Sequence, residues 1–240
     1  MNELGNLISE HKGNETATGS TLMIGFVCFG LTVGMVALFF GEKEISFNKF
    51  LFGACGIFAL IGGIGCVQSF LRNQGGNVAF YENGIVAEKG GKRHTARWNE
   101  IAVLYESVEK IYMKGVYVYD RYLYTIKKQD GEEFVLSNMI ADINEIGRVL
   151  KRKTLENLYP QAKEKIANGE KVMFDSLFVD KNGLSGIEWA QLSKVKVKDD
   201  LLEVKNKAGK TVVHGSYGAT PNAHLLLKLL EEHLFVERDS

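Results

Sequence analysis

Two long apolar runs limit what this chain can fold into. Residues 21–41 and residues 50–71 contain no charged side chain, and only the polar residues 42–49 separate them. An α-helix rises about 1.5 Å per residue, so each run is long enough as a helix to cross a hydrocarbon core of roughly 30 Å. Both runs are apolar on every face, unlike a helix that buries one stripe in a soluble core. The sequence therefore predicts a transmembrane helical hairpin over residues 21–71.

Two alternatives for these runs are a buried helical hairpin in a soluble core and a signal peptide. The signal peptide is disfavoured, because the first twenty residues hold one Lys and three Glu, and no A-x-A-like site follows Phe40. Rows of small residues would let the helices approach closely, either within the hairpin or between two copies of the chain. These rows contain Gly30, Gly34, Ala59 and Gly63.

The distribution of basic residues predicts the orientation of this hairpin. With two spans both termini lie on one side, where Lys12, Arg72 and the basic residues from Lys89 onward outnumber Lys43 and Lys49 in the turn. Cytoplasmic segments carry the excess of Lys and Arg. The prediction is an integral membrane protein with two spans, with both termini and the polar part in the cytoplasm and the lipid bilayer as its first partner. Cys28, Cys55 and Cys66 all lie in the apolar runs and are interpreted as small apolar fillers, not disulfides.

A repeated motif predicts the organisation of the polar part. Residues 93–106 read "RHTARWNEIAVLYE" and residues 186–197 read "GIEWAQLSKVKV". In both, Trp is followed two positions later by Glu or Gln, then by Ile or Leu and a run with strand-like alternation. The repeat predicts two units, residues 77–158 and 171–236, joined by a connecting segment at 159–170 and preceded by an N-terminal tail at 1–20.

Each unit reads as short antiparallel strands closed by a helix. Asn-Gly, Gly-Gly and Asp-Gly pairs separate the strands and supply the positive φ that hairpin turns need. A helical spacing of apolar residues begins at Met139, where Ser137 or Asn138 can cap the helix, and a second one follows Asn222. Trp98 precedes Asn138 by 40 residues, whereas Trp189 precedes Asn222 by only 33. The first unit is therefore expected to have longer strands or loops.

This plan resembles the pleckstrin-homology-like fold in its bacterial versions. The fold is a small antiparallel sheet of about seven strands closed by a C-terminal helix, with the Trp motif entering a middle strand. More closely, the chain is similar to a family of uncharacterised membrane proteins with two such units behind a transmembrane hairpin. The segments that carry the resemblance are "YENGIV", "RWNEI", "QDGEEFVLSN", "NGLSGIEWAQL" and "TPNAHLLLKLL". The fold class implied is a membrane-anchored α+β protein, and the resemblance brings no catalytic residue with it.

No known catalytic or metal-binding motif occurs in the sequence. G-x-S-x-G, H-E-x-x-H and Walker A patterns are absent, and the five histidines show no ligand spacing. We therefore expect no enzyme activity, no cofactor and no metal. The balance of 29 basic against 29 acidic residues favours no nucleic-acid partner.

A basic cluster and the two tryptophans are the candidate site residues. Lys89, Lys92, Arg93 and Arg97 lie in one predicted hairpin, where several donors could converge on the phosphate of a lipid headgroup. The alternative is a basic surface that only faces anionic lipid or solvent. Trp98 and Trp189 are expected to be core anchors between sheet and helix.

The function predicted on these grounds is a membrane-anchored scaffold or interaction protein, because binding modules need no polar pocket. Sensing of anionic lipid headgroups by the basic hairpin is the alternative. A protein partner and association with a second copy of the chain both remain open.

Overall fold

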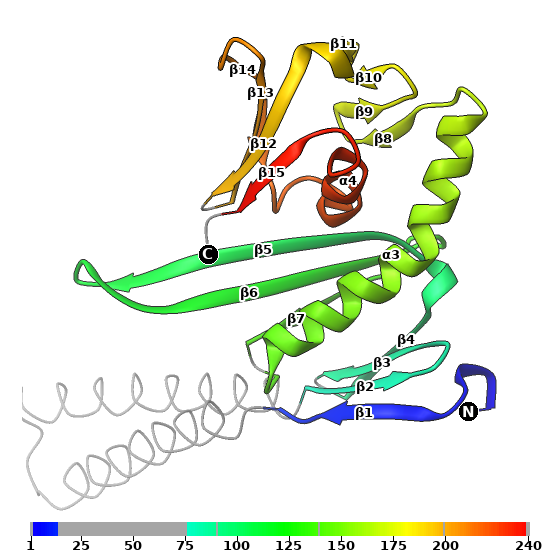
Figure 1. Cartoon of the computed structure of the whole chain (residues 1–240). Coiled ribbons are helices and arrows are strands. Elements are labelled where there is room, and N and C mark those ends of the chain that lie inside the picture. Colours follow the sequence, from blue (N-terminus) through cyan, green and yellow to red (C-terminus); the bar gives the residue numbers. More distant parts are fainter. Residues whose placement is uncertain (1, 14–75, 90, 139, 199, 239–240) are drawn as a thin grey trace, which may run out of the picture.

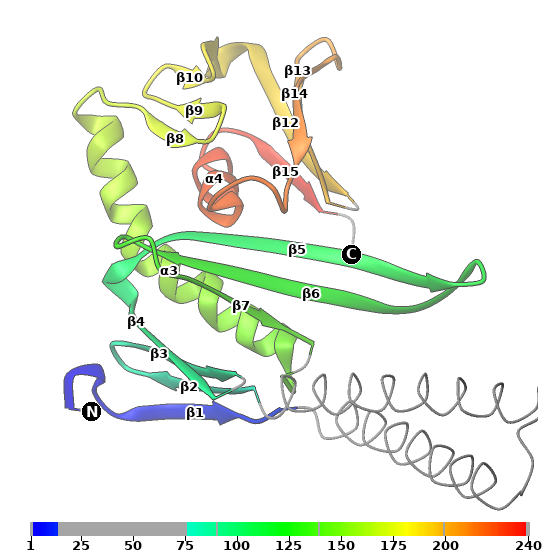
Figure 2. The same cartoon turned by 180° about the vertical axis from the view of Figure 1, so that it is seen from behind.

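The structure is a computed structural model that describes residues 2–13, 76–89, 91–138, 140–198 and 200–238 (Figures 1 and 2). A short 3₁₀ turn, η1 (Asn2–Leu4), precedes the first strand. The remaining elements fall into two consecutive sets of seven strands and a helix, followed by one last strand.

The first set consists of two antiparallel sheets and a long helix. The sheets have the orders β1-β2-β3-β4 and β5-β6-β7. The 3₁₀ turn η2 (Trp98–Glu100) connects them. The elements are β1 (Leu7–His11), β2 (Asn77–Tyr81), β3 (Gly84–Lys89), β4 (Lys92–Arg97), β5 (Ile101–Met113), β6 (Val116–Lys128), β7 (Glu133–Ser137) and α3 (Ile143–Ala167).

The second set repeats this order with shorter strands. Its sheets have the orders β11-β10-β9-β8 and β14-β13-β12-β15, and the last strand, β15, pairs in parallel with β12. The 3₁₀ turn η3 (Trp189–Gln191) again connects them. The elements are β8 (Val172–Phe174), β9 (Leu177–Val179), β10 (Gly183–Leu184), β11 (Ile187–Glu188), β12 (Leu192–Lys198), β13 (Leu201–Asn206), β14 (Thr211–Ser216), α4 (Ala223–Leu230) and β15 (Phe235–Arg238).

The two tryptophan motifs occupy equivalent places in the two sets. Each Trp opens a 3₁₀ turn, and its backbone N–H donates to the carbonyl of the Asn of an Asn-Gly pair, Asn83 for Trp98 and Asn182 for Trp189. The glycine of the second pair, Gly183, is packed so closely that a Cβ would lie 1.8 Å from the Ile187 carbonyl oxygen. The sequence repeat is therefore also a repeat of local structure.

Each set has its own apolar core. In the first, Phe80, Ile101 and Tyr124 from the two sheets pack with residues of α3 such as Ile146. In the second, the leucines of α4 pack on Phe174 and on strands β12 and β13. Helix α4 is only eight residues long, but seven of them are buried. The helices therefore close the sheets in both sets.

Helix α3 links the two sets. It begins against the first core, continues through Pro160 and changes direction in its second half (Figure 1). A proline inside a helix removes one backbone hydrogen bond and bends the helix. The buried Thr154 hydroxyl lies 2.8 Å from Nε2 of His224 on α4. The helix thus contacts both cores.

Asn222 fixes the start of α4 to the edge of β5. Its Oδ1 accepts a hydrogen bond of 2.8 Å from the Leu104 N–H, and its Nδ2 donates one of 2.9 Å to the Ala102 carbonyl. The side-chain amide thus takes the place of a peptide group of a neighbouring strand. The backbone of Asn222 is left-handed, with φ of 52°, a conformation that Asn tolerates better than most residues.

Replacing Asn222 by Gly tests this contact, because glycine keeps the left-handed backbone and deletes only the amide. Two hydrogen bonds between the sets are lost, so we expect the free energy of unfolding to fall by about 1–3 kcal/mol. Urea unfolding followed by circular dichroism measures it. Asp142→Gly is the matched control, since Asp142 has the equivalent left-handed position before α3. An equal loss in both variants would contradict the role of the amide.

The predicted fold class, with its transmembrane hairpin, is corrected by this structure. The described residues form mostly β-sheet with two α-helices, and neither helix is long and apolar enough to cross a membrane. Helix α4 would reach only about 12 Å, and α3 carries nine charged side chains. The predicted spans, residues 21–41 and 50–71, lie outside the described residues, as do Gly30, Gly34, Ala59 and Gly63. The predictions of an integral membrane protein with two spans and of its orientation are accordingly withdrawn.

Two further differences concern the ends of the first unit. Residues 7–11, assigned to the N-terminal tail, form β1 and pair with β2. The connecting segment at 159–170 is mostly the second half of α3, which ends at Ala167. β1 has only five residues, and its partner strand begins 70 residues later in the sequence. Sequence periodicity is a local property, so it did not reveal this pairing.

Candidate functional site

The predicted basic cluster lies on the β3–β4 hairpin, where its two arginines face carboxylates. Lys89 and Lys92 are opposite each other beside the turn. Arg93 Nε lies 3.7 Å from Glu88 Oε1, and the Arg97 guanidinium pairs with Glu3 of the N-terminal 3₁₀ turn. The arginines alternate with inward-facing residues and so share one face of β4. Arg93 and Arg97 therefore lie on one face of β4 but roughly 13 Å apart along the strand. Lys89 and Lys92 lie at the turn, next to Arg93.

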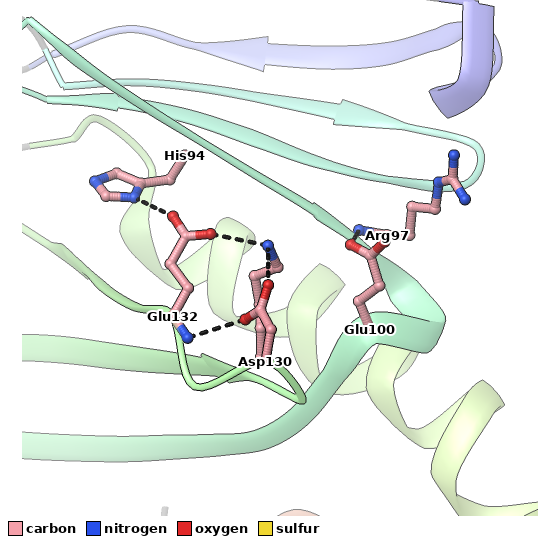
Figure 3. A network of polar contacts seen from close by, with 6 residues as sticks. His94, Arg97, Glu100, Asp130 and Glu132 are labelled. Carbon is pink, nitrogen blue, oxygen red and sulfur yellow. Dashed lines mark hydrogen bonds and ion pairs between the residues drawn. The ribbon is translucent and has the colours of Figure 1, made fainter.

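A network of charges beside this cluster connects β4 to the β6–β7 turn (Figure 3). Glu132 lies 2.8 Å from both His94 Nδ1 and Lys128 Nζ, and Asp130 lies 3.1 Å from the same lysine. The hydrogen bonds from Lys128 and then His94 lower the pKa of Glu132, while the Glu132 carboxylate raises the pKa of Lys128. These charged groups form hydrogen bonds and ion pairs with one another, so the network connects the two sheets of the first set.

One of the concave features beside these residues is a shallow depression of about 530 Å³. It is lined by Arg93, Arg97 and Lys128, but also by Glu3 and Glu100. Glu100 accepts a hydrogen bond from the backbone N–H of Arg97. An incoming phosphate would meet these carboxylates, which does not favour headgroup binding. Anion binding by this cluster stays a prediction that no finding tests.

The two tryptophans differ in burial. Trp98 is 8% exposed, belongs to the first core and donates from Nε1 to the Glu82 carbonyl at 3.0 Å. Trp189 is partly buried against the second core and stacks on the His233 ring, with 4.2 Å between ring centroids. Among the described residues, no group of three or more His, Cys, Asp or Glu is placed to hold a metal ion.

The most unusual surface is the outer half of the β5–β6 hairpin, residues 108–121, which we call the arm. Strands β5 and β6 are each 13 residues long and project beyond the other strands (Figures 1 and 2). Six large apolar side chains near the turn, which we call the arm tip, are between 45% and 68% exposed. The arm tip consists of Tyr112, Met113, Val116, Tyr117, Val118 and Tyr119.

Both faces of the arm tip are apolar. A register shift places Tyr117 opposite Tyr112, and their rings meet edge to face with centroids 6.0 Å apart. Tyr119 is opposite Ile111, the neighbour of Tyr112 on β5, and therefore lies on the other face. Strands with one buried face alternate apolar and polar residues. An arm with two apolar faces is unlike a strand pair that only covers its own core.

The arm begins where neighbouring strands stop. β7 pairs with β6 only at residues 123–127, and the Asn138 amide then binds the Tyr122 N–H and the Asp120 carbonyl. On the other edge, Asn222 binds β5 at Ala102 and Leu104. Beyond these amides, no strand of the described chain pairs with the outer edges of β5 or β6. Among the described residues, both edges of the arm thus lack a strand partner, and both faces of the arm tip are apolar.

Charged residues form a belt between the arm tip and the core. Arg121 Nη1 lies 3.6 Å from Glu109 Oε2, and Lys110 is opposite Asp120. Partial desolvation, followed by the Asp120 carboxylate, raises the pKa of Tyr117. The belt carries both signs and has no excess of either. The arm therefore offers apolar contact without a strong electrostatic preference.

None of the predicted site residues lies in the arm, although the sequence contains a signal for it. Both halves of the β5–β6 hairpin were predicted to be strands. The longer interval from Trp98 to Asn138 indicated that the first unit has longer strands or loops. The run Val116–Tyr119 lacks the polar residue that alternation would place at every second position. That lack is the sequence signal of a strand with two apolar faces.

The fold and this surface define a chain of two repeated sheet-and-helix units with a projecting apolar arm. The chain belongs to a family of unknown function, DUF6585, whose model matches residues 1–239. No curated protein and no solved structure matches it.

Proposed function

We propose that this chain is a non-enzymatic binding protein whose arm docks onto a protein partner. The observation that carries the proposal is the arm tip, with six large apolar side chains exposed on a ribbon whose edges no other described strand covers. Contiguous exposed apolar patches mark interaction sites. Tyrosine, which contributes three of the six residues, is enriched at protein interfaces.

The energetics of the arm support this proposal. A two-stranded ribbon is marginally stable in water by itself, and exposed strand edges readily pair with another chain. The arm lacks the Pro or the row of lysines that would protect its edges from pairing. A partner that covers the arm tip would bury apolar surface and satisfy backbone groups together.

The resemblance to the pleckstrin-homology-like fold is part of the same proposal. Both units have seven strands followed by a helix, the order expected of that fold. Proteins of this kind work through their surfaces, so the proposal needs no catalytic cluster.

Photo-crosslinking in cells tests the proposed function. With a photoreactive amino acid in place of Tyr117 in the full chain, we expect discrete protein adducts on irradiation. The same amino acid in place of Lys207, an exposed residue after β13, is the control and should give none of them. Adducts are separated by electrophoresis and identified by mass spectrometry. The proposal fails if the Tyr117 position gives no adduct, or the same adducts as the control.

A further inference from the structure

We infer that the partner of the arm is the arm of a second copy of this chain; the inference rests on the proposed function. A second arm supplies what the first one lacks, because its tip has the same apolar residues and its edges have the same open backbone groups. Most oligomers of soluble proteins are symmetric, with the same patch used by both copies. Such a contact requires that the charges of two arms do not repel each other and that the arms bury enough apolar area.

The charges of the arm permit self-association. Its belt contains two acidic residues, Glu109 and Asp120, and two basic ones, Lys110 and Arg121, and Lys114 lies in the turn. A partner with a strongly acidic surface, such as a nucleic acid, would be selected by a large excess of basic residues, whereas the arm has three basic and two acidic ones. The whole chain balances 29 basic against 29 acidic residues, so two copies do not repel each other by net charge.

The apolar area is sufficient for a weak dimer. A fully covered aromatic side chain buries about 150–250 Å², so three half-exposed tyrosines and three aliphatic residues offer roughly 500 Å² per arm. Two arms would together bury roughly 1,000 Å², somewhat below the usual range of stable interfaces. We therefore expect a dimer whose population depends on protein concentration.

The experiment uses two full-length versions of the chain, with different tags, expressed in the same cells. One carries the photoreactive amino acid at position 117, and the other is unmodified. We expect an adduct with the mass of two chains that carries both tags. The photoreactive amino acid at position 207 should not produce it. Introducing Tyr112→Ser and Val116→Ser into the unmodified copy should lower the yield about tenfold, because central aromatic residues dominate interfaces.

Phe235→Ser in the unmodified copy is the matched control. Phe235 is 71% exposed but lies on β15, so this change should leave the yield unaltered. The replaced arm residues are exposed, and equal melting temperatures of the variants will show that they fold. Adducts formed with other proteins only would overturn the second-copy inference and leave the proposed function standing. The absence of any adduct from position 117 would overturn both.

Discussion

Trp98→Ala is expected to lower the free energy of unfolding by about 3–5 kcal/mol, the usual cost of deleting a buried aromatic side chain. Trp98 is 8% exposed, and its ring stacks on Phe80 with centroids 6.1 Å apart. Its Nε1 also donates to the carbonyls of Glu82 and Tyr81. The substitution therefore leaves a cavity between the two sheets and two carbonyls without their donor. Chemical unfolding followed by circular dichroism measures the loss.

Trp189→Ala is the natural control for this prediction. The two tryptophans begin equivalent 3₁₀ turns, but Trp189 is only partly buried. Less apolar area is lost at Trp189, so the decrease in stability should be clearly smaller than for Trp98→Ala. Equal losses at both positions, or no change for Trp98→Ala, would contradict the core described for the first unit.

Acidification from pH 7 to pH 4 is expected to remove about 3 kcal/mol of stability through His224 alone. This imidazole is 7% exposed, beside Thr154 of α3. Burial, followed by the nearby Lys151 ammonium, lowers the pKa of His224 from 6.5 to about 4. Each unit of pKa difference between the folded and unfolded states corresponds to about 1.4 kcal/mol.

The sign of the effect follows from the protonation of the two states. Between pH 6.5 and pH 4 the unfolded chain binds a proton at His224 and the folded chain does not, so lowering the pH favours unfolding. The contribution of neutral His224 is complete above about pH 6.5 and is lost progressively as the pH falls toward 4. His224 lies on α4 and contacts Thr154 of α3, so the contact between the two units should weaken first.

His224→Gln separates this effect from that of other titrating groups. Glutamine keeps a polar side chain of similar size but does not titrate, so the variant should lose less stability than the native chain between pH 7 and pH 4. The measurement is urea unfolding of both proteins at several pH values in this interval. Parallel pH profiles would show that His224 does not have the lowered pKa.

The local structure of this chain could be predicted from its sequence more fully than its long-range pairing. The Asn83-Gly84 and Asn182-Gly183 turns and the entry of each Trp into a strand depend on neighbouring residues, which periodicity and turn chemistry describe. The hydrogen-bond partners of Asn138 could not be predicted in this way. It was expected to cap a helix, but its amide binds the Tyr122 N–H and the Asp120 carbonyl of β6. Local sequence does not reveal which distant strand an amide will meet.

The candidate site illustrates the same limit. Arg97 was predicted to converge with other donors on a phosphate, yet Glu3, which is 94 residues away in the sequence, pairs with it. The run Val116–Tyr119 indicates a strand with two apolar faces, but the sequence does not show that the arm tip is exposed. Exposure depends on where β7 and the Asn222 loop end beside β5 and β6. The predicted membrane hairpin relied on hydropathy alone, and the described residues do not support it.

The pairing of β1 with β2 has a consequence for shortening the chain. His11 lies opposite Val78 at the end of the β1–β2 pair, and beyond it Gly13 pairs with Ile140. A truncation that begins near residue 73 would discard β1, leaving Phe80 and its neighbours on a new sheet edge. Joining residues 13 and 76 through a hairpin loop of about two to five residues would keep β1. Residues 14–75 thus stand in the sequence between two strands that pair with each other. A shortened chain that lacks these residues can be joined at the two ends of this insertion.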